Sequence, residues 1–146
     1  MTQETDDLMV GLALRRVAER YALAVDTVDG ALFAAQFTDD GVLESPRGRF
    51  VGKDALKSVP AMVRVRYLRT FHAVLNLVPA IVGDTAEAET YSIARHFFSD
   101  AAGQALCHEM TIRYQDRFKK TAAGWLLANR RLVVDAARTF PVDGPH

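Results

Sequence analysis

The stretch Thr70-Phe71-His72-Ala73-Val74-Leu75-Asn76-Leu77-Val78 decides the fold, because here the spacing of apolar residues changes from helical to alternating. Four long segments with a period of two begin at this point, and strands are predicted over residues 70–82, 86–98, 105–119 and 125–135. Short connections that contain glycine separate these strands: 83–84, 100–103 and 121–124. Connections of this kind predict a mostly antiparallel meander.

Upstream of this stretch, apolar residues recur every three to four positions and predict helices over residues 6–28, 31–37 and 54–68. Asp29 is placed to cap the second helix, and Pro60 should kink or divide the third. The first helix has an apolar stripe made of Leu8, Leu12, Val17, Tyr21, Val25 and Val28. Because helices come first and strands last, we predict an α+β fold rather than alternating βαβ units.

Three shorter segments complete the prediction. Thr38-Asp39-Asp40-Gly41 has the residue types of a turn and should end the second helix. Short strands are predicted at 42–45 and 50–51, joined by a turn. The last residues, 140–146, are predicted to be loose.

Bulk composition excludes several classes of protein. A length of 146 residues predicts one domain, and 49% apolar with 25% charged residues is ordinary for a soluble globular protein. Eighteen basic residues balance eighteen acidic ones, which argues against a nucleic-acid binder. The acidic start of the chain and the absence of a run of ~20 apolar residues predict no signal peptide and no membrane span. A single cysteine, Cys107, favours a reducing compartment, so we expect a cytoplasmic protein.

Two ionisable residues interrupt the apolar patterns. Asp26 closes the first helical pattern, and His72 opens the first long strand. Buried ionisable groups are costly unless they are paired, so we expect Asp26 and His72 to pair with each other. The alternatives are that Asp26 bonds local backbone at the end of its helix and that His72 is an isolated core or edge histidine.

The second long strand predicts a hollow beside this pair. Its outward face carries charged residues, and its inward face is formed by Ala88, Thr90, Ser92, Ala94, His96 and Phe98. Small inward residues leave space, which is typical of a concave sheet with a ligand site. A two-residue connection at 83–84 would pair His72 with Arg95, and a longer connection or a bulge would pair it with His96. The charge pattern favours His96.

With these features in place, the chain resembles the SnoaL-like branch of the nuclear-transport-factor-2-like superfamily. The residues that carry the resemblance are 21–29, 32–43, 71–76, 82–88, 114–118 and 124–131. The resemblance implies one domain over 1–146, folded as a cone-shaped α+β barrel in which N-terminal helices pack in a bent, mostly antiparallel sheet. It also implies a single deep pocket and a homodimer or homotrimer.

The resemblance gives roles to individual residues. Asp26 and His72 stand at the positions of an Asp–His pair in scytalone dehydratase, bile-acid 7α-dehydratase and hexachlorocyclohexane dehydrochlorinase. It implies a set of substrate-binding candidates: Tyr21, Asn76, His96 and Arg130. Val25 and Ser45 differ from these dehydratases, which have tyrosines at or near those positions, so the substrate does not follow from the resemblance.

A neutral histidine with an ordinary pKa near ~6.5 is a suitable general base, and an aspartate can fix its tautomer and stabilise the imidazolium. Tyr21 or Arg130 could then stabilise a departing or enolic oxygen. The sequence thus predicts a cofactor-independent lyase or isomerase, dehydratase- or cyclase-like, that abstracts a proton from a small apolar cyclic or polyketide-like substrate. The four histidines lack metal-site spacing, so no metal is expected. The alternatives are a non-catalytic small-molecule binder and a structural partner like the β subunit of ring-hydroxylating dioxygenases.

Overall fold

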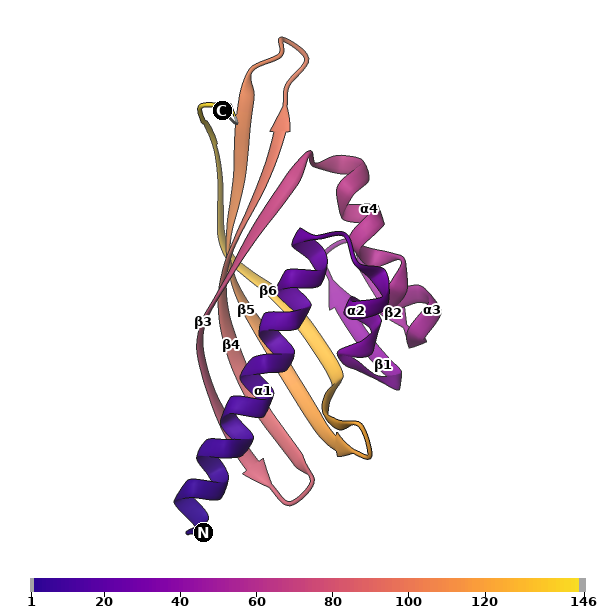
Figure 1. Cartoon of the computed structure of the whole chain (residues 1–146). Coiled ribbons are helices and arrows are strands. Elements are labelled where there is room, and N and C mark those ends of the chain that lie inside the picture. Colours follow the sequence, from indigo (N-terminus) through magenta and orange to yellow (C-terminus); the bar gives the residue numbers. More distant parts are fainter. Residues whose placement is uncertain (1, 145–146) are drawn as a thin grey trace.

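A computed structural model describes residues 2–144 and places four helices on one side of a six-stranded sheet (Figure 1). The helices are α1 (Gln3–Asp26), α2 (Gly30–Ala35), α3 (Gly52–Lys57) and α4 (Val59–Arg66). The strands are β1 (Phe37–Ser45), β2 (Gly48–Val51), β3 (Arg69–Val82), β4 (Thr85–Ser99), β5 (Ala105–Thr121) and β6 (Gly124–Pro141). The predicted α+β class is confirmed.

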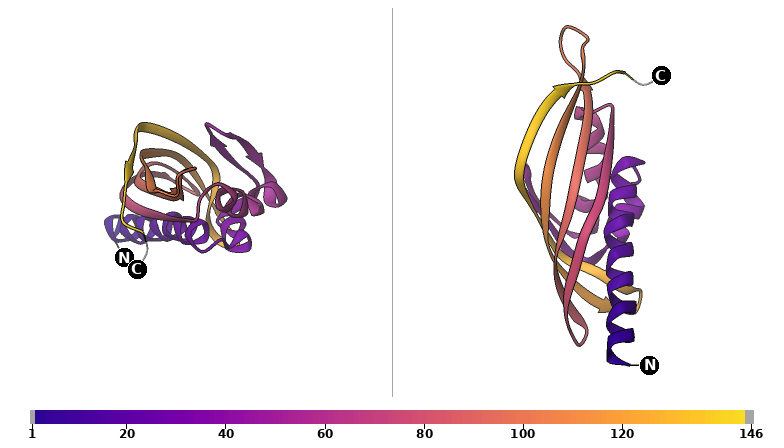
Figure 2. Two further views of the ribbon diagram at one scale, coloured as in Figure 1. Left: turned by 90° about the horizontal axis from the view of Figure 1, so that it is seen from above. Right: turned by 90° about the vertical axis from the view of Figure 1, so that its left-hand side faces the viewer.

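The sheet has the order β2-β1-β6-β5-β4-β3, and only the pairing of β1 with β6 is parallel. The four long strands bow in the same direction, and the helices gather on the hollow side of the curve (Figure 2). The result is the cone-shaped α+β architecture, with β2 and β3 as free edges rather than a closed barrel. The predicted meander of long strands is confirmed.

Local sequence chemistry sets the ends of the helices. The Asp29 carboxylate accepts a hydrogen bond from the backbone N–H of Leu32 at 2.9 Å and so caps α2, as predicted. Pro60 lies in the first turn of α4, where a missing N–H costs nothing, and the predicted third helix is divided just before it. Val28, in the link from α1 to α2, has a φ of 56°, which a β-branched residue rarely adopts. That backbone reversal turns the chain from α1 into α2, which packs against α1 and α3.

Two predicted segments are wrong. Residues 38–41 lie within β1 rather than in a turn, although the register of β1 against β6 shifts between Phe37 and Val42. Turn-type residues are tolerated there because the strand is irregular at that point. Phe140 and Pro141 belong to β6 and pair with the start of β5, because β5 is long enough to give them partners. Residues 145 and 146 of the predicted loose tail lie outside the described residues.

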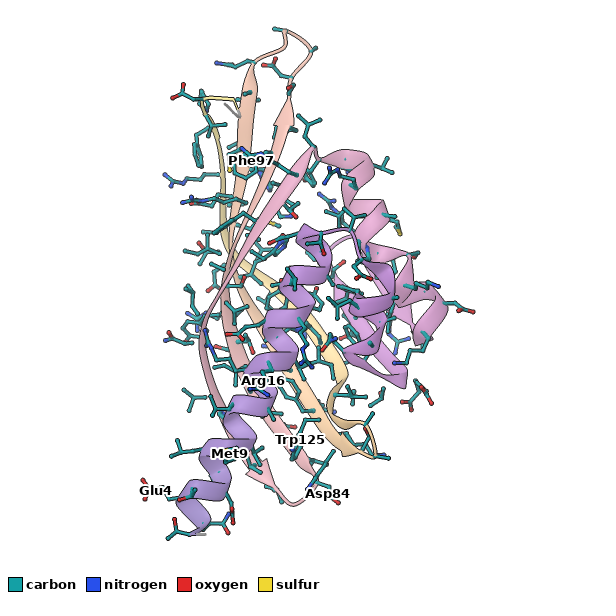
Figure 3. The ribbon with its side chains drawn as sticks, viewed as in Figure 1. Glu4, Met9, Arg16, Asp84, Phe97 and Trp125 are labelled. Atoms are coloured by element: carbon teal, nitrogen blue, oxygen red, sulfur yellow. The ribbon has the colours of Figure 1, made fainter. Side chains whose placement is uncertain are left out.

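The apolar stripe predicted for α1 is wrong in its first half. Leu8 and Leu12 are 65% and 56% exposed. The face of α1 that packs on the sheet is buried from the fourth turn onward and consists of Leu14, Val17, Ala18, Tyr21, Ala22, Ala24 and Val25. The first turns of α1 lie near the hairpin end of the sheet, where Figure 3 also places Asp84 and Trp125.

A β-bulge in β3 decides which side chains of that strand face inward. Val74 pairs with Ser92 but Leu77 pairs with Thr90, so two residues of β3, Leu75 and Asn76, oppose a single residue of β4. Side chains point alternately to the two faces of a strand. One extra residue therefore reverses which residues face inward on one side of the bulge. Odd-numbered residues face inward beyond the bulge, and even-numbered residues, His72 among them, face inward before it.

Arg15 of α1 holds this bulge in place. Its guanidinium donates hydrogen bonds to the carbonyl oxygens of Leu75 at 2.7 Å and Val74 at 3.0 Å. Its Nε lies 2.9 Å from a carboxylate oxygen of Glu19, one helical turn later. A bulge leaves backbone groups without strand partners, and a cationic donor satisfies them well.

Replacing Arg15 with alanine should therefore lower the free energy of unfolding by about 1 kcal/mol, the usual size for exposed charge-assisted hydrogen bonds. Arg16→Ala is the matched control, because Arg16 is on the same helix and has no hydrogen bond or ion pair within residues 2–144. Urea denaturation of both variants measures the difference. Equal losses in the two variants would show that Arg15 does not fasten the bulge.

Candidate functional site

A cavity of about 570 Å³ lies between α1, α4 and the concave face of the sheet. Most of its wall is apolar and includes Val25, Leu43, Phe50, Val63, Ile112 and Leu132. Its exposed lining residues mark the mouth: Pro46, Arg47, Met62, Arg66 and Ala137. The inward residues predicted to leave this space do not do so: of that face of the second long strand, only His96 lines the cavity, and the small residues Thr90, Ser92 and Ala94 are buried by packing.

Asp26 and His72 are joined by two hydrogen bonds, and His72 lies in the cavity wall. Nδ1 of His72 lies 2.6 Å from Oδ1 of Asp26, and the backbone N–H of His72 donates to Oδ2 at 3.0 Å. The hydroxyl of Thr70 donates to Oδ1 at 2.8 Å. The side chain of His72 is 7% exposed and that of Asp26 24%, so the pair is largely shielded from water. The C-terminal residue of α1 is thereby tied to two neighbouring inward positions of β3.

These contacts determine the state of the imidazole. A carboxylate can only accept hydrogen bonds, so Nδ1 of His72 donates the proton, and in the neutral imidazole this tautomer leaves the lone pair on Nε2. Since His72 lines the cavity, Nε2 is the nitrogen that a bound molecule can meet. Partial burial raises the pKa of the Asp26 carboxyl, but hydrogen bonds from His72 and Thr70 lower it more, so the pKa lies below its ordinary value. Asp26 is therefore anionic at neutral pH.

His96 stands next to His72 in the wall, with the two ring centroids 5.5 Å apart. Burial, and after it the positive charge that His72 can carry, lower the pKa of His96 to about 4. Nδ1 of His96 is the one buried side-chain nitrogen or oxygen without a hydrogen-bond partner in the described part of the chain. At neutral pH, His96 is thus an uncharged ring in the cavity wall.

A buried ion pair lies beneath the cavity. The guanidinium of Arg130 donates two hydrogen bonds of 2.7 Å to the two carboxylate oxygens of Asp116, and Thr90 donates a third at 2.7 Å. The carbon of the guanidinium lies 4.3 Å from the ring centroid of Tyr21 and 4.0 Å from that of Tyr114. Both tyrosines line the cavity, so Arg130 supports the aromatic floor from below.

The structure brings together four of the six candidate residues. Asp26 and His72 form the pair described above, and Tyr21 and His96 line the same cavity. Arg130 lies under Tyr21 and Tyr114 and is not among the lining residues. Asn76 is exposed in the bulge of β3, on the opposite face from His72.

The predicted strand partner of His72 is wrong. Neither Arg95 nor His96 pairs with it; the direct partner is Ala94, and His96 pairs with Thr70. A two-residue connection at Gly83-Asp84 does join the strands, but the bulge moves the register one residue further, in the direction opposite to the one predicted. His96 nevertheless shares the inward face with His72, because His96 lies two positions along β4 from Ala94, the strand partner of His72.

Sequence reasoning missed Asp116 and the arginines of the mouth. Asp116 alternates with Tyr114 and Phe118 on the inward face of β5, and a charged residue in that pattern is a sign of a buried ion pair. Arg47 and Arg66 come to one cavity only after the β1–β2 turn and the end of α4 fold over the sheet, so the sequence does not place them together.

A second hollow of about 660 Å³ is lined mainly by charged and amide side chains, among them Glu87, Glu89, Arg117 and Arg131. Glu87 and Glu89 are already paired with arginines of β5 at 3.5 and 3.1 Å.

Within residues 2–144, no group of three or more His, Cys, Asp or Glu side chains is arranged to hold a metal ion. No helix in the same part of the chain is long and apolar enough to cross a membrane.

Residues 7–131 match the family model of the SnoaL-like domain. No curated protein sequence matches the chain. Among solved structures, Rv3472(D26N), a protein of unknown function from Mycobacterium tuberculosis, is 28% identical with a TM-score of 0.81, over 92% of this chain and 77% of that one.

Two further solved structures share the fold. A proposed scytalone dehydratase from Novosphingobium aromaticivorans is 21% identical with a TM-score of 0.80, over 95% of this chain and 93% of that one. Hexachlorocyclohexane dehydrochlorinase LinA-type3 from Novosphingobium barchaimii is 16% identical with a TM-score of 0.80, over 99% and 97% of the two chains. At such identities, the likeness establishes the architecture.

The lowered pKa of His96 makes stability depend on pH. The unfolded chain binds a proton at His96 near the ordinary pKa of 6.5, whereas the folded chain does so only near 4, so stability falls as the pH drops through this window. Between pH 7 and pH 4.5, the free energy of unfolding should fall by about 2 kcal/mol more in the wild type than in His96→Gln. Denaturant titrations at a series of pH values test this, and parallel curves for the two proteins would contradict it.

Removing Arg130 should be strongly destabilising. Arg130→Met leaves the fully buried Asp116 carboxylate uncompensated, which costs about 3–5 kcal/mol in comparable cases. Adding Asp116→Asn to Arg130→Met removes that buried charge and should recover part of the loss. Arg131→Met, an exposed neighbour on β6, is the control and should change stability by no more than about 0.5 kcal/mol. Thermal unfolding of the four proteins decides whether the cost is specific to the pair.

Proposed function

The chain belongs to the SnoaL-like family of the nuclear-transport-factor-2-like superfamily, and from this premise we propose that it is a cofactor-independent lyase or isomerase that abstracts a proton from carbon. The observation that carries the proposal is the 2.6 Å contact between Nδ1 of His72 and Oδ1 of Asp26 in the wall of a largely apolar cavity. The substrate class that suits this cavity is a small, largely apolar cyclic or polyketide-like molecule.

In the proposed reaction, the lone pair on Nε2 of His72 accepts a proton from a carbon next to a carbonyl or next to the carbon that bears a leaving group. The electron pair of the broken C–H bond forms a carbon–carbon double bond. This movement of the electron pair either generates an enolate or expels the leaving group with its bonding electrons. The resulting imidazolium is stabilised by the Asp26 carboxylate. It returns its proton to another carbon in an isomerisation, or to the departing oxygen in a dehydration. General base catalysis of this kind is worth roughly 10²–10⁴-fold.

Tyr21 and Tyr114 are the candidates for stabilising the oxygen of the substrate. Burial raises the pKa of both phenols, so both remain protonated and can donate a hydrogen bond. The guanidinium of Arg130, stacked under the two rings, adds positive charge behind them. A phenol backed in this way can donate to a developing enolate or alkoxide.

A non-catalytic small-molecule binder is the second candidate function, and one observation favours it. Asp26 also accepts hydrogen bonds from the backbone of His72 and from Thr70, so it has a purely structural use in fastening α1 to β3. In that case the same contacts would persist in a protein that performs no chemistry.

Hydrogen–deuterium exchange distinguishes the two functions without knowledge of the natural substrate. The probe is 2-tetralone, a small apolar cyclic ketone with acidic C–H bonds, followed by NMR in D₂O. The wild type should accelerate exchange above the rate in buffer, His72→Ala should lose about 10²-fold or more, and Asp26→Asn about 10-fold or more. Gln115→Ala on the outer face of β5 is the control. Tetralone binding without accelerated exchange would favour the binder, and full exchange by His72→Ala would refute the assigned base.

A further inference from the structure

The mouth of the cavity carries positive charge that nothing in the described structure neutralises. Arg47, in the turn between β1 and β2, and Arg66, the last residue of α4, both line the cavity and both are exposed. No aspartate or glutamate belongs to the lining, all of which falls within residues 2–144. The charged groups that a ligand meets at this opening are therefore cationic.

Several arginines elsewhere on the surface are paired with carboxylates. On the outer face of the sheet, Arg95 lies 2.7 Å from Glu109, and Arg113 lies 2.6 Å from Asp135. Arg49, two residues after Arg47, lies 3.5 Å from Glu44. Across the described residues, neither Arg47 nor Arg66 is within ion-pair distance of a carboxylate.

Arg47 is held over the opening by Tyr67. Its Nη2 donates a hydrogen bond of 2.7 Å to the hydroxyl of Tyr67, and its guanidinium carbon lies 5.4 Å from the centroid of that ring. The ring of Tyr67 in turn packs on His96, with centroids 4.6 Å apart. Nη2 of Arg47 is thus held by Tyr67 beside the cavity wall. The remaining N–H donors of the guanidinium stay free for a ligand.

We propose that the cavity takes an apolar ligand with one anionic group, such as a carboxylate, which Arg47 and Arg66 hold at the mouth while the apolar body reaches His72. This rests on the proposed function, because it names the class of substrate for the same site. Guanidinium groups match carboxylates with two parallel hydrogen bonds, and cations at an opening with apolar walls attract anions from solution. The apolar interior then rewards the burial of a hydrocarbon body.

Two fluorescent probes that share one ring system test the proposal. 8-Anilinonaphthalene-1-sulfonate carries one negative charge, and N-phenyl-1-naphthylamine is the same skeleton without it. The wild type should bind the anionic probe about 5- to 10-fold more tightly, as two exposed charge contacts allow. The double variant R47Q/R66Q should lose this preference and keep its affinity for the neutral probe. Raising the salt concentration should reduce the preference in the wild type only.

The control is R49Q/R64Q, which removes two positive charges from the same β1–β2 hairpin and the same helix but from outside the cavity lining. It should leave both affinities within about 2-fold of the wild type. The proposal is overturned if the control loses as much as the mouth variant, if the wild type shows no preference for the anion, or if neither probe binds. Because no outcome depends on turnover, failure here is separate from failure of the tetralone exchange experiment.

Discussion

The attachment of Asp26 to β3 is the contact on which the rest of the site depends. Three hydrogen bonds converge on one carboxylate, two of them from His72 and one from Thr70. They fix the distance between the end of α1 and the sheet, and they select the tautomer of the imidazole at the same time. Both the backbone N–H and the ring of His72 bond to the same carboxylate. The ring is therefore fixed relative to its own main chain, and the direction of Nε2 is fixed with it.

Polarity is distributed along the cavity in layers. The floor is aromatic and rests on an ion pair that is fully withdrawn from water. The middle of the wall is apolar except for the histidines, and the opening is cationic. This order places permanent charge at the two ends of the cavity, where it is neutralised or solvated, and leaves only the histidines as polar groups in the middle. A hydrophobic environment around a paired histidine is suited to moving a proton, because little solvent competes for it.

The sequence carries enough information to predict the α+β class, the long strands and the pair of Asp26 and His72, because all three depend on local periodicity and on residues that break it. The side of β3 that faces inward depends on the bulge at Leu75 and Asn76, which no propensity signals and which Arg15 stabilises from a distant helix. The burial of Leu8 and Leu12 is predicted from the pattern of α1 alone, but the face of α1 that packs on the sheet at this level contains Val10 and Gly11 instead. Arg130 was recognised, but its position below the tyrosines depends on Asp116, a partner that only the folded sheet brings next to it.

The bulge in β3 has a consequence for how the length of this chain can vary. Between Asn76 and the hairpin at Gly83-Asp84, the number of residues determines the face on which His72 emerges. Adding or removing one residue there would keep a strand of similar composition and similar hydrogen bonding, yet it would turn the imidazole toward solvent and bring its neighbour into the cavity. A change in length within this short segment of β3 would therefore change which side chain faces the cavity.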